Sequence, residues 1–179
     1  MHVAAYARGR VGGRIALAAL FLLAGCGAGK EAETAREVPA IPGIDADAGP
    51  VALRDLLIPY RAGGYPAGSD VPLVVRLFSE ATQPVALGEV TPGTAGVMTV
   101  QASRIVLVRG TTAGGSPSPL VIQPGGYLSL VPPSTPHLVA EHISAALRYG
   151  AGVPVRFTFS SGRAVEVDVP MAAPDYAVG

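Results

Sequence analysis

The stretch "VPVRFTFSSGRAVEVDVP", from Val153 to Pro170, carries the clearest structural signal in the chain. Apolar residues take every second position before the Ser-Ser-Gly turn, and the alternation resumes after it with valines on one side and acidic residues on the other. Period-two alternation on both sides of a glycine-containing turn is typical of a β-hairpin. One apolar and one charged face predict an antiparallel sheet that is solvated on one side.

Similar strand and turn signals extend back from this hairpin to about Val51. Runs rich in branched apolar residues cover 51–60, 71–78 and 96–110, and turns rich in proline and glycine separate them. The one helix-like window, "EHISAALRYG", is short and lies among strands, so we expect a loop there. The 23 glycines and 17 prolines also favour many short elements over long helices. The sequence therefore predicts an all-β fold, a Greek-key β-sandwich of antiparallel strands.

The N-terminus resembles a bacterial lipoprotein signal. Three arginines and no acidic residue precede a short apolar run, Ile15–Gly25, which ends directly before Cys26. A basic start followed by a short apolar core is the pattern of a secretory signal, and the run is too short for a permanent membrane span. The ending "LLAGC" resembles the lipobox, which implies that residues 1–25 are removed and that Cys26 is lipidated. The alternative is a plain signal peptide with an incidental cysteine.

Lipidation would explain the single cysteine as neither a disulfide partner nor a nucleophile. We expect the protein on the outer, extracytoplasmic face of the cell membrane, periplasmic or extracellular, and anchored by lipid at Cys26. From Cys26 onward the chain has 10 basic and 13 acidic residues, a formal charge of −3, so nucleic acid is not an expected partner. Nucleotide chemistry is not expected outside the cytoplasm either. The polar, acidic residues 26–50 predict a flexible tether, 51–172 the folded domain, and 173–179 a tail.

Several segments of the predicted domain resemble one known family. "VTPGTAGVMTV", "IQPGG" and "PHL", followed by "GVPVRFTF" and "VEVDVP", are similar to the PCu(A)C-type periplasmic copper chaperones. The resemblance covers roughly residues 51–172. It implies a cupredoxin-like β-sandwich that binds or delivers Cu(I) outside the cytoplasm. It also implies a partner in cytochrome oxidase assembly.

The resemblance also implies a metal site, which must be transferred residue by residue. The family site uses a histidine, a later methionine, and a His-x-Met pair after the Pro-Gly-Gly strand; such imidazole and thioether ligands suit the soft Cu(I) ion. Here His137 matches the histidine of the pair, but Val139 stands at the methionine position. The first histidine falls near Gln101 and Ser103, and the intermediate methionine has no counterpart. The predicted metal ligands are therefore His137 and Met98, since Met98 lies close to the expected first histidine.

Other interpretations of these residues stay open. His137 could instead pair with His142, although five residues along an extended strand would place the two rings on opposite faces. A zinc site with two ligands would be weak, because zinc normally takes three or four protein ligands. His137 could also be a plain turn residue, and the contribution of Met171 is undecided. The alternative function is then a non-catalytic structural or protein-interaction lipoprotein that has lost its metal site.

The sequence offers no support for an enzyme. No Gly-x-Ser-x-Gly elbow is present, and the glycine turns lack the lysine of a phosphate-binding loop. Glu166 and Asp168 fall on the same face of a predicted strand, which is the usual pattern of a solvated surface. We therefore expect a protein without catalytic residues.

Overall fold

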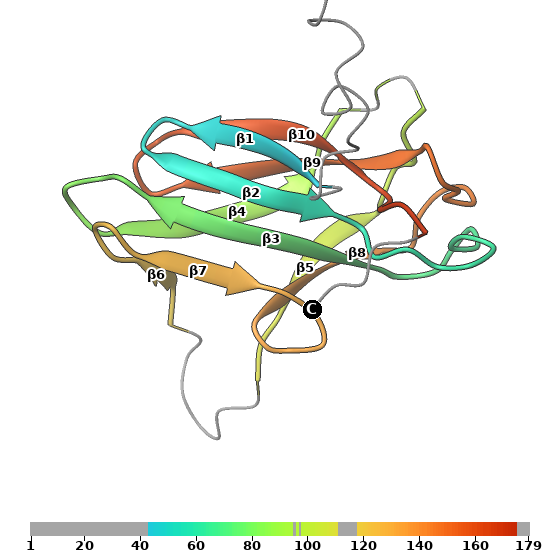
Figure 1. The fold of residues 1–179 in the computed structure, drawn as a ribbon, viewed down its shortest axis with the longest axis horizontal. Coiled ribbons are helices and arrows are strands. Elements are labelled where there is room, and N and C mark those ends of the chain that lie inside the picture. Colours follow the sequence, from blue (N-terminus) through green and yellow to red (C-terminus); the bar gives the residue numbers. More distant parts are fainter. Residues whose placement is uncertain (1–42, 95, 97, 111–117, 175–179) are drawn as a thin grey trace, which may run out of the picture. The chain divides into compact units, whose positions relative to one another are not determined.

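The computed structural model describes residues 43–94, 96, 98–110 and 118–174 of the chain (Figure 1). These residues form ten strands and no helix that is long and apolar enough to cross a membrane. The strands are β1 (Ile44–Ala48), β2 (Val51–Leu57), β3 (Val71–Ser79), β4 (Val85–Pro92), β5 (Arg104–Val108), β6 (Leu120–Ile122), β7 (Tyr127–Leu130), β8 (His137–Glu141), β9 (Gly152–Phe159) and β10 (Ala164–Pro170).

The strands are arranged in two sheets that pack face to face (Figure 1). One sheet has the order β1-β2-β3-β8-β5, with β7 paired to the second half of β3, and the other has the order β10-β9-β4-β6. All these pairings are antiparallel. Neighbours such as β3 and β8, or β4 and β9, are distant in sequence, as in Greek-key connections. The predicted all-β sandwich is confirmed.

The C-terminal hairpin has the register that its alternation predicts. Val165 lies opposite Phe157, and Val167 lies opposite Val155, across the β9–β10 ladder. Phe157 is 1% exposed, whereas Glu166 points outward and lies 3.7 Å from the Arg156 guanidinium. The apolar face of this hairpin therefore supplies one wall of the core.

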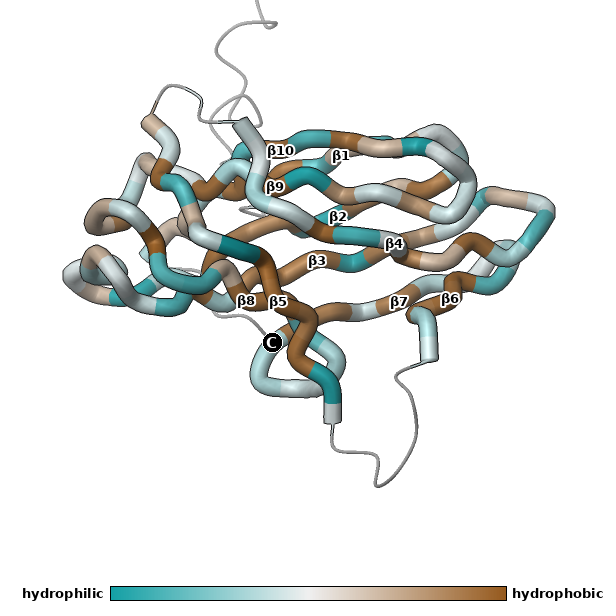
Figure 2. Tube along the Cα trace, turned by 180° about the vertical axis from the view of Figure 1, so that it is seen from behind, coloured by the Kyte–Doolittle hydropathy of each residue, from teal (hydrophilic) through white to brown (hydrophobic). Residues whose placement is uncertain are grey.

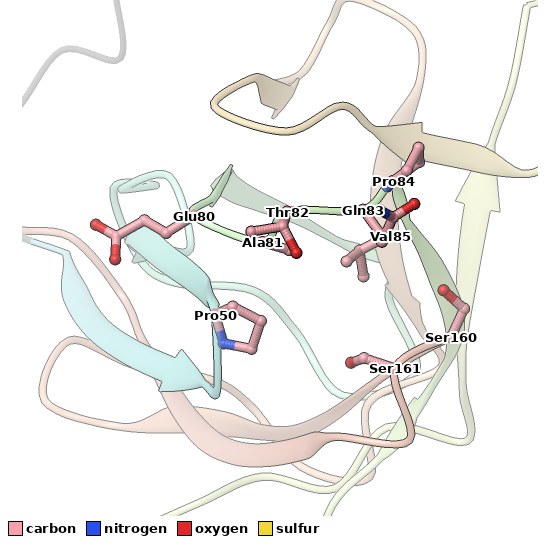
Figure 3. A pocket seen from close by; sticks show the side chains of 9 residues that line it. All are labelled: Pro50, Glu80, Ala81, Thr82, Gln83, Pro84, Val85, Ser160 and Ser161. Carbon is pink, nitrogen blue, oxygen red and sulfur yellow. The ribbon is translucent and has the colours of Figure 1, made fainter.

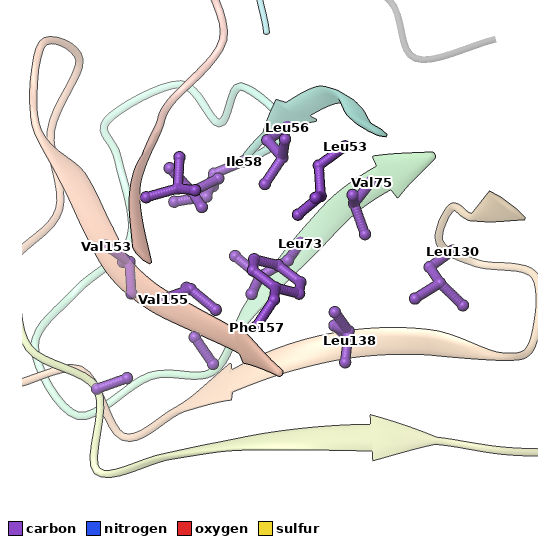
Figure 4. Close-up of a cluster of buried hydrophobic side chains, with 14 of the residues drawn as sticks. Leu53, Leu56, Ile58, Leu73, Val75, Leu130, Leu138, Val153, Val155 and Phe157 are labelled. Carbon is purple, nitrogen blue, oxygen red and sulfur yellow. The ribbon is translucent and has the colours of Figure 1, made fainter. Parts of the chain in front are cut away.

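The core lies between the two sheets (Figure 4). Leu53 of β2, Leu73 of β3 and Leu138 of β8 face Phe157 of β9, and all four side chains are essentially inaccessible to water. Hydropathy mapped along the chain shows hydrophobic stretches on β3, β8 and β5 (Figure 2). Burying side chains of this size stabilises the fold by about 1.5–3 kcal/mol each. The core thus fixes which face of β8 remains available for ligands.

Some predicted boundaries differ from the structure. The range expected to be a tether, residues 26–50, contains β1, so the folded part begins earlier than Val51. In the run 96–110, β5 takes the second part, and Thr99 in the first part forms an isolated bridge with Gly152. In the helix-like window, Glu141 ends β8 and residues 142–150 form a loop, as expected. Cys26, the predicted lipidation site, lies outside the described residues.

Candidate functional site

His137 is held in a defined orientation at the start of β8. It lies opposite Val108 of β5 and is half-buried. Its ring Nδ1 is 2.7 Å from the backbone carbonyl oxygen of Ser134. A carbonyl oxygen can only accept a hydrogen bond, so Nδ1 carries the proton and donates it. When the ring is neutral, its lone pair is then on Nε2, which is the usual state of a histidine that binds a metal.

Val139 lies on the same face of β8 as His137. Side chains alternate along a strand, and Leu138 and Ala140 point into the core with 0% exposure. His137 and Val139 are both half-buried on the other side. The position at which the resemblance places a sulfur ligand is therefore next to His137, but it carries an aliphatic side chain.

Met98 lies in a different part of the sandwich. Its side chain is 69% exposed, its φ is +63°, and its carbonyl oxygen accepts a 3.2 Å hydrogen bond from the amide of Gly152 at the start of β9. Ser103, further along the same segment, bonds to the carbonyl of Glu141 at the end of β8. Four residues of strand, from His137 to Glu141, span about 13 Å. The structure thus does not bring Met98 and His137 together, and the ligand role of each stays a prediction.

His142 and Met171 have other partners. The backbone amide of His142 donates to Asp70 Oδ1 at 3.1 Å, and its ring Nδ1 lies 3.8 Å from the same oxygen. His142 follows the last residue of β8, so it lies at the opposite end of this strand from His137. Met171 is 4% exposed and packs in the core. Neither residue adds a visible donor beside His137.

Comparison with known proteins identifies the architecture. No protein-family model matches the sequence, and the search of curated proteins gives no significant match. Among solved structures, the apo PCuAC domain from PmoF1 matches with a TM-score of 0.57 and 15% identity, over 73% of this chain and 100% of that chain. The copper-bound PCuAC domain from PmoF2 matches with a TM-score of 0.53 and 14% identity, over 73% of this chain and 99% of that chain. This chain has a PCuAC-like fold.

The PCuAC-like sandwich carries only part of the donor set that the resemblance implies. Within the described residues, no group of three or more histidine, cysteine, aspartate or glutamate side chains could hold a metal ion. His137 presents one imidazole nitrogen, and Val139 beside it offers no sulfur. What the sequence could not show is the Ser134 carbonyl that fixes the His137 ring. Its nearest signal is the turn "PPSTPH" just before the strand.

The sandwich also has a surface pocket of about 430 Å³ away from these residues (Figure 3). The β1–β2 turn, the β3–β4 loop and the β9–β10 turn form it, and Figure 3 shows Pro50, Glu80, Ser160 and Ser161 around it. The hydroxyl oxygen of Ser160 accepts a hydrogen bond from the amide of Ala86, so it is used structurally. The residues that line the pocket include neither histidine nor methionine, which separates it from the predicted metal ligands.

Proposed function

We propose that this protein is a membrane-anchored extracytoplasmic lipoprotein that binds and delivers Cu(I), with His137 as a ligand. The observation that carries the proposal is the Nδ1–Ser134 hydrogen bond, because it leaves the Nε2 lone pair of a half-buried ring available to a metal. The similarity to a PCuAC domain that is copper-bound supports the choice of metal. Copper is the cargo of such a protein, so a site with few ligands is suited to release as well as to binding.

The anchor and the partner belong to the same proposal. Lipid at Cys26 would keep the sandwich at the outer face of the membrane, and the residues between Cys26 and β1 would separate the two. A metal carrier in this place would meet membrane-bound acceptors, of which a cytochrome oxidase assembly partner is the one that the family resemblance suggests. The proposed role involves no covalent chemistry, so no catalytic residue is assigned.

An anaerobic Cu(I) titration of the full chain against a competing chelator tests the copper proposal. The chain carries Cys26→Ala, because a free thiol would itself bind Cu(I). We expect stoichiometric binding in the sub-micromolar range that is lost in His137→Ala. His142→Ala is the matched control, since it removes a histidine held by Asp70 at the other end of β8. Met98→Leu measures whether that sulfur contributes.

The second candidate function is a non-catalytic interaction module that has lost its metal site. Two observations favour it: an aliphatic residue, Val139, occupies the position beside His137, and Met98 is bonded to the start of β9 and is not brought beside His137. The same titration separates the two functions. Binding no tighter than millimolar, unchanged in His137→Ala, would reject the copper carrier and leave the interaction module.

A further inference from the structure

Two loops meet at the end of the sandwich where β8 stops and β3 begins. Tyr65 and Leu147 exchange backbone hydrogen bonds, both 2.9 Å long, and so join the loop after β2 to the loop before β9. Gly64 allows this close approach, because a Cβ there would lie 2.3 Å from the Leu147 carbonyl oxygen, and its φ is +78°. The two loops are therefore fixed to each other, and residues on both sides of the contact have defined neighbours.

A small pocket of about 180 Å³ lies between these loops. Four of its lining residues carry chemistry: Tyr60 and Arg61 from the first loop, and Arg148 and Tyr149 from the second. No carboxylate lines the pocket. Among the described residues, no aspartate or glutamate lies within 4.0 Å of either guanidinium, although four other arginines have such partners. The pocket thus concentrates positive charge that the described part of the chain does not neutralise.

Arg61 is positioned before any ligand arrives. Its guanidinium carbon lies 5.5 Å from the centre of the Tyr65 ring, a cation–π distance. Tyr65 is itself fixed, because it is 7% exposed and its hydroxyl donates a 2.9 Å hydrogen bond to the carbonyl of Pro59. A guanidinium held in this way loses less conformational freedom when it binds an anion.

From this geometry we propose that the pocket between Arg61 and Arg148 binds a phosphate group. Guanidinium groups match the oxygens of phosphate with paired, charge-assisted hydrogen bonds. Tyr60 and Tyr149, which also line the pocket, carry hydroxyl groups that can donate hydrogen bonds. The volume is below that of pockets for drug-sized ligands, so it suits one phosphate group and not a whole nucleotide. This site is at the opposite end of β8 from His137, and it does not depend on copper binding.

The phosphate could come from free inorganic phosphate or from a lipid headgroup, and two measurements distinguish these sources. The first is calorimetric titration of the full chain carrying Cys26→Ala with inorganic phosphate, with acetate as a competitor. The second is co-flotation of the same chain with vesicles of phosphatidylcholine, with and without phosphatidylglycerol. Both use Arg61→Gln, Arg148→Gln and the control Arg163→Gln. The control removes the same charge from the β9–β10 turn at the other end of the sandwich.

We expect phosphate to bind with a Kd below about 1 mM. Arg61→Gln and Arg148→Gln should each weaken binding by about tenfold, because each removes a charge-assisted contact, whereas Arg163→Gln should not. The site is assigned to lipid headgroups if binding to anionic vesicles shows the same dependence on Arg61 and Arg148 and if free phosphate displaces the protein from these vesicles. Phosphate binding without that vesicle dependence assigns it to the free anion. The proposal is overturned if the Arg61 and Arg148 variants weaken the binding of phosphate and of anionic vesicles no more than the Arg163 variant does. It is also overturned if acetate competes for the site as well as phosphate binds to it.

Discussion

At the scale of single residues, residue 139 is the missing ligand position that lies directly beside His137. Val139 lies on the same face of β8 as His137, with the Nε2 lone pair of that histidine available. We predict that Val139→Met tightens Cu(I) binding by about tenfold or more, because it adds a thioether two positions from the imidazole. Chelator competition measures the change. Val165→Met, at a half-buried valine of β10, is the control, and an equal gain in both variants would contradict the prediction.

A second residue-scale prediction concerns Tyr65 and alkaline pH. Burial raises the pKa of the Tyr65 phenol above its usual value, and the nearby Arg61 guanidinium opposes this only partly. Above about pH 10 the unfolded chain therefore binds fewer protons than the folded chain, and the free energy of unfolding falls as pH rises. We expect the free energy of unfolding of Tyr65→Phe to fall less steeply with pH in the alkaline range, because the variant has no phenol at this position. Its stability at pH 8 should be lower by about 1 kcal/mol, because the hydrogen bond to Pro59 is lost.

Urea denaturation at intervals between pH 8 and pH 11 measures how the free energy of unfolding depends on pH. The quantity to compare between the variants is the slope of the unfolding free energy against pH. The absolute unfolding free energy is not compared, so the hydrogen bond lost in Tyr65→Phe does not obscure the result. Tyr60→Phe changes an exposed tyrosine of the same loop and should retain the decline. Equal slopes for Tyr65→Phe and the unmodified chain would show that another group controls alkaline stability.

At the scale of elements, β1 shows how a small strand completes the first sheet. Ala48 is 2% exposed against the core, and Asp47 forms a 2.9 Å ion pair with Arg54 of β2. We predict that a chain beginning at residue 51 is less stable than one beginning at residue 43. Each ladder hydrogen bond lost with β1 should cost about 1 kcal/mol. Urea midpoints of the two truncated chains test this, and equal midpoints would mean that β1 does not contribute.

The same strand shows what sequence patterns could and could not predict. The β9–β10 hairpin was predictable because large apolar residues alternate with charged ones on both sides of a glycine turn. In "IDADA", the sequence of β1, the inward positions after Ile44 are only alanines, and the two aspartates look like part of an acidic tether. The strand signal there is weak because the residues have low β-propensity, and pairing with β2 overrides it.

For the candidate site, the sequence could not show which distant residues lie close together in space. The sequence could identify His137 and Val139 as neighbours on one strand face, since that follows from alternation alone. It could not show that Met98 joins the start of β9, because that contact joins segments more than fifty residues apart. Nor could it show the pocket of Arg61 and Arg148, whose two loops are joined by long-range backbone bonds such as those between Tyr65 and Leu147. Local patterns predicted the sheets, and long-range contacts decided which polar side chains meet.

At the scale of the whole molecule, copper delivery and phosphate binding would both depend on where the sandwich is held. If Cys26 carries lipid, each buried methylene of the acyl chains contributes about 0.8 kcal/mol to membrane attachment, and stable anchoring needs more than one chain. We predict that Cys26→Ala moves the protein from the membrane fraction to the soluble extracytoplasmic fraction of a bacterial host. Fractionation followed by immunodetection measures this distribution.

The expected mass provides an independent readout of the same prediction. The unmodified chain should lose residues 1–25 and gain the mass of lipid on Cys26, whereas Cys26→Ala should lack the lipid. His137→Ala is the matched control, because it alters the sandwich and leaves the signal unchanged, so its distribution should equal that of the unmodified chain. The prediction fails if the proportion of Cys26→Ala in the membrane fraction equals that of the unmodified chain, because lipid at this residue is then not the anchor. The phosphate pocket would then be the first surface to test for membrane attachment.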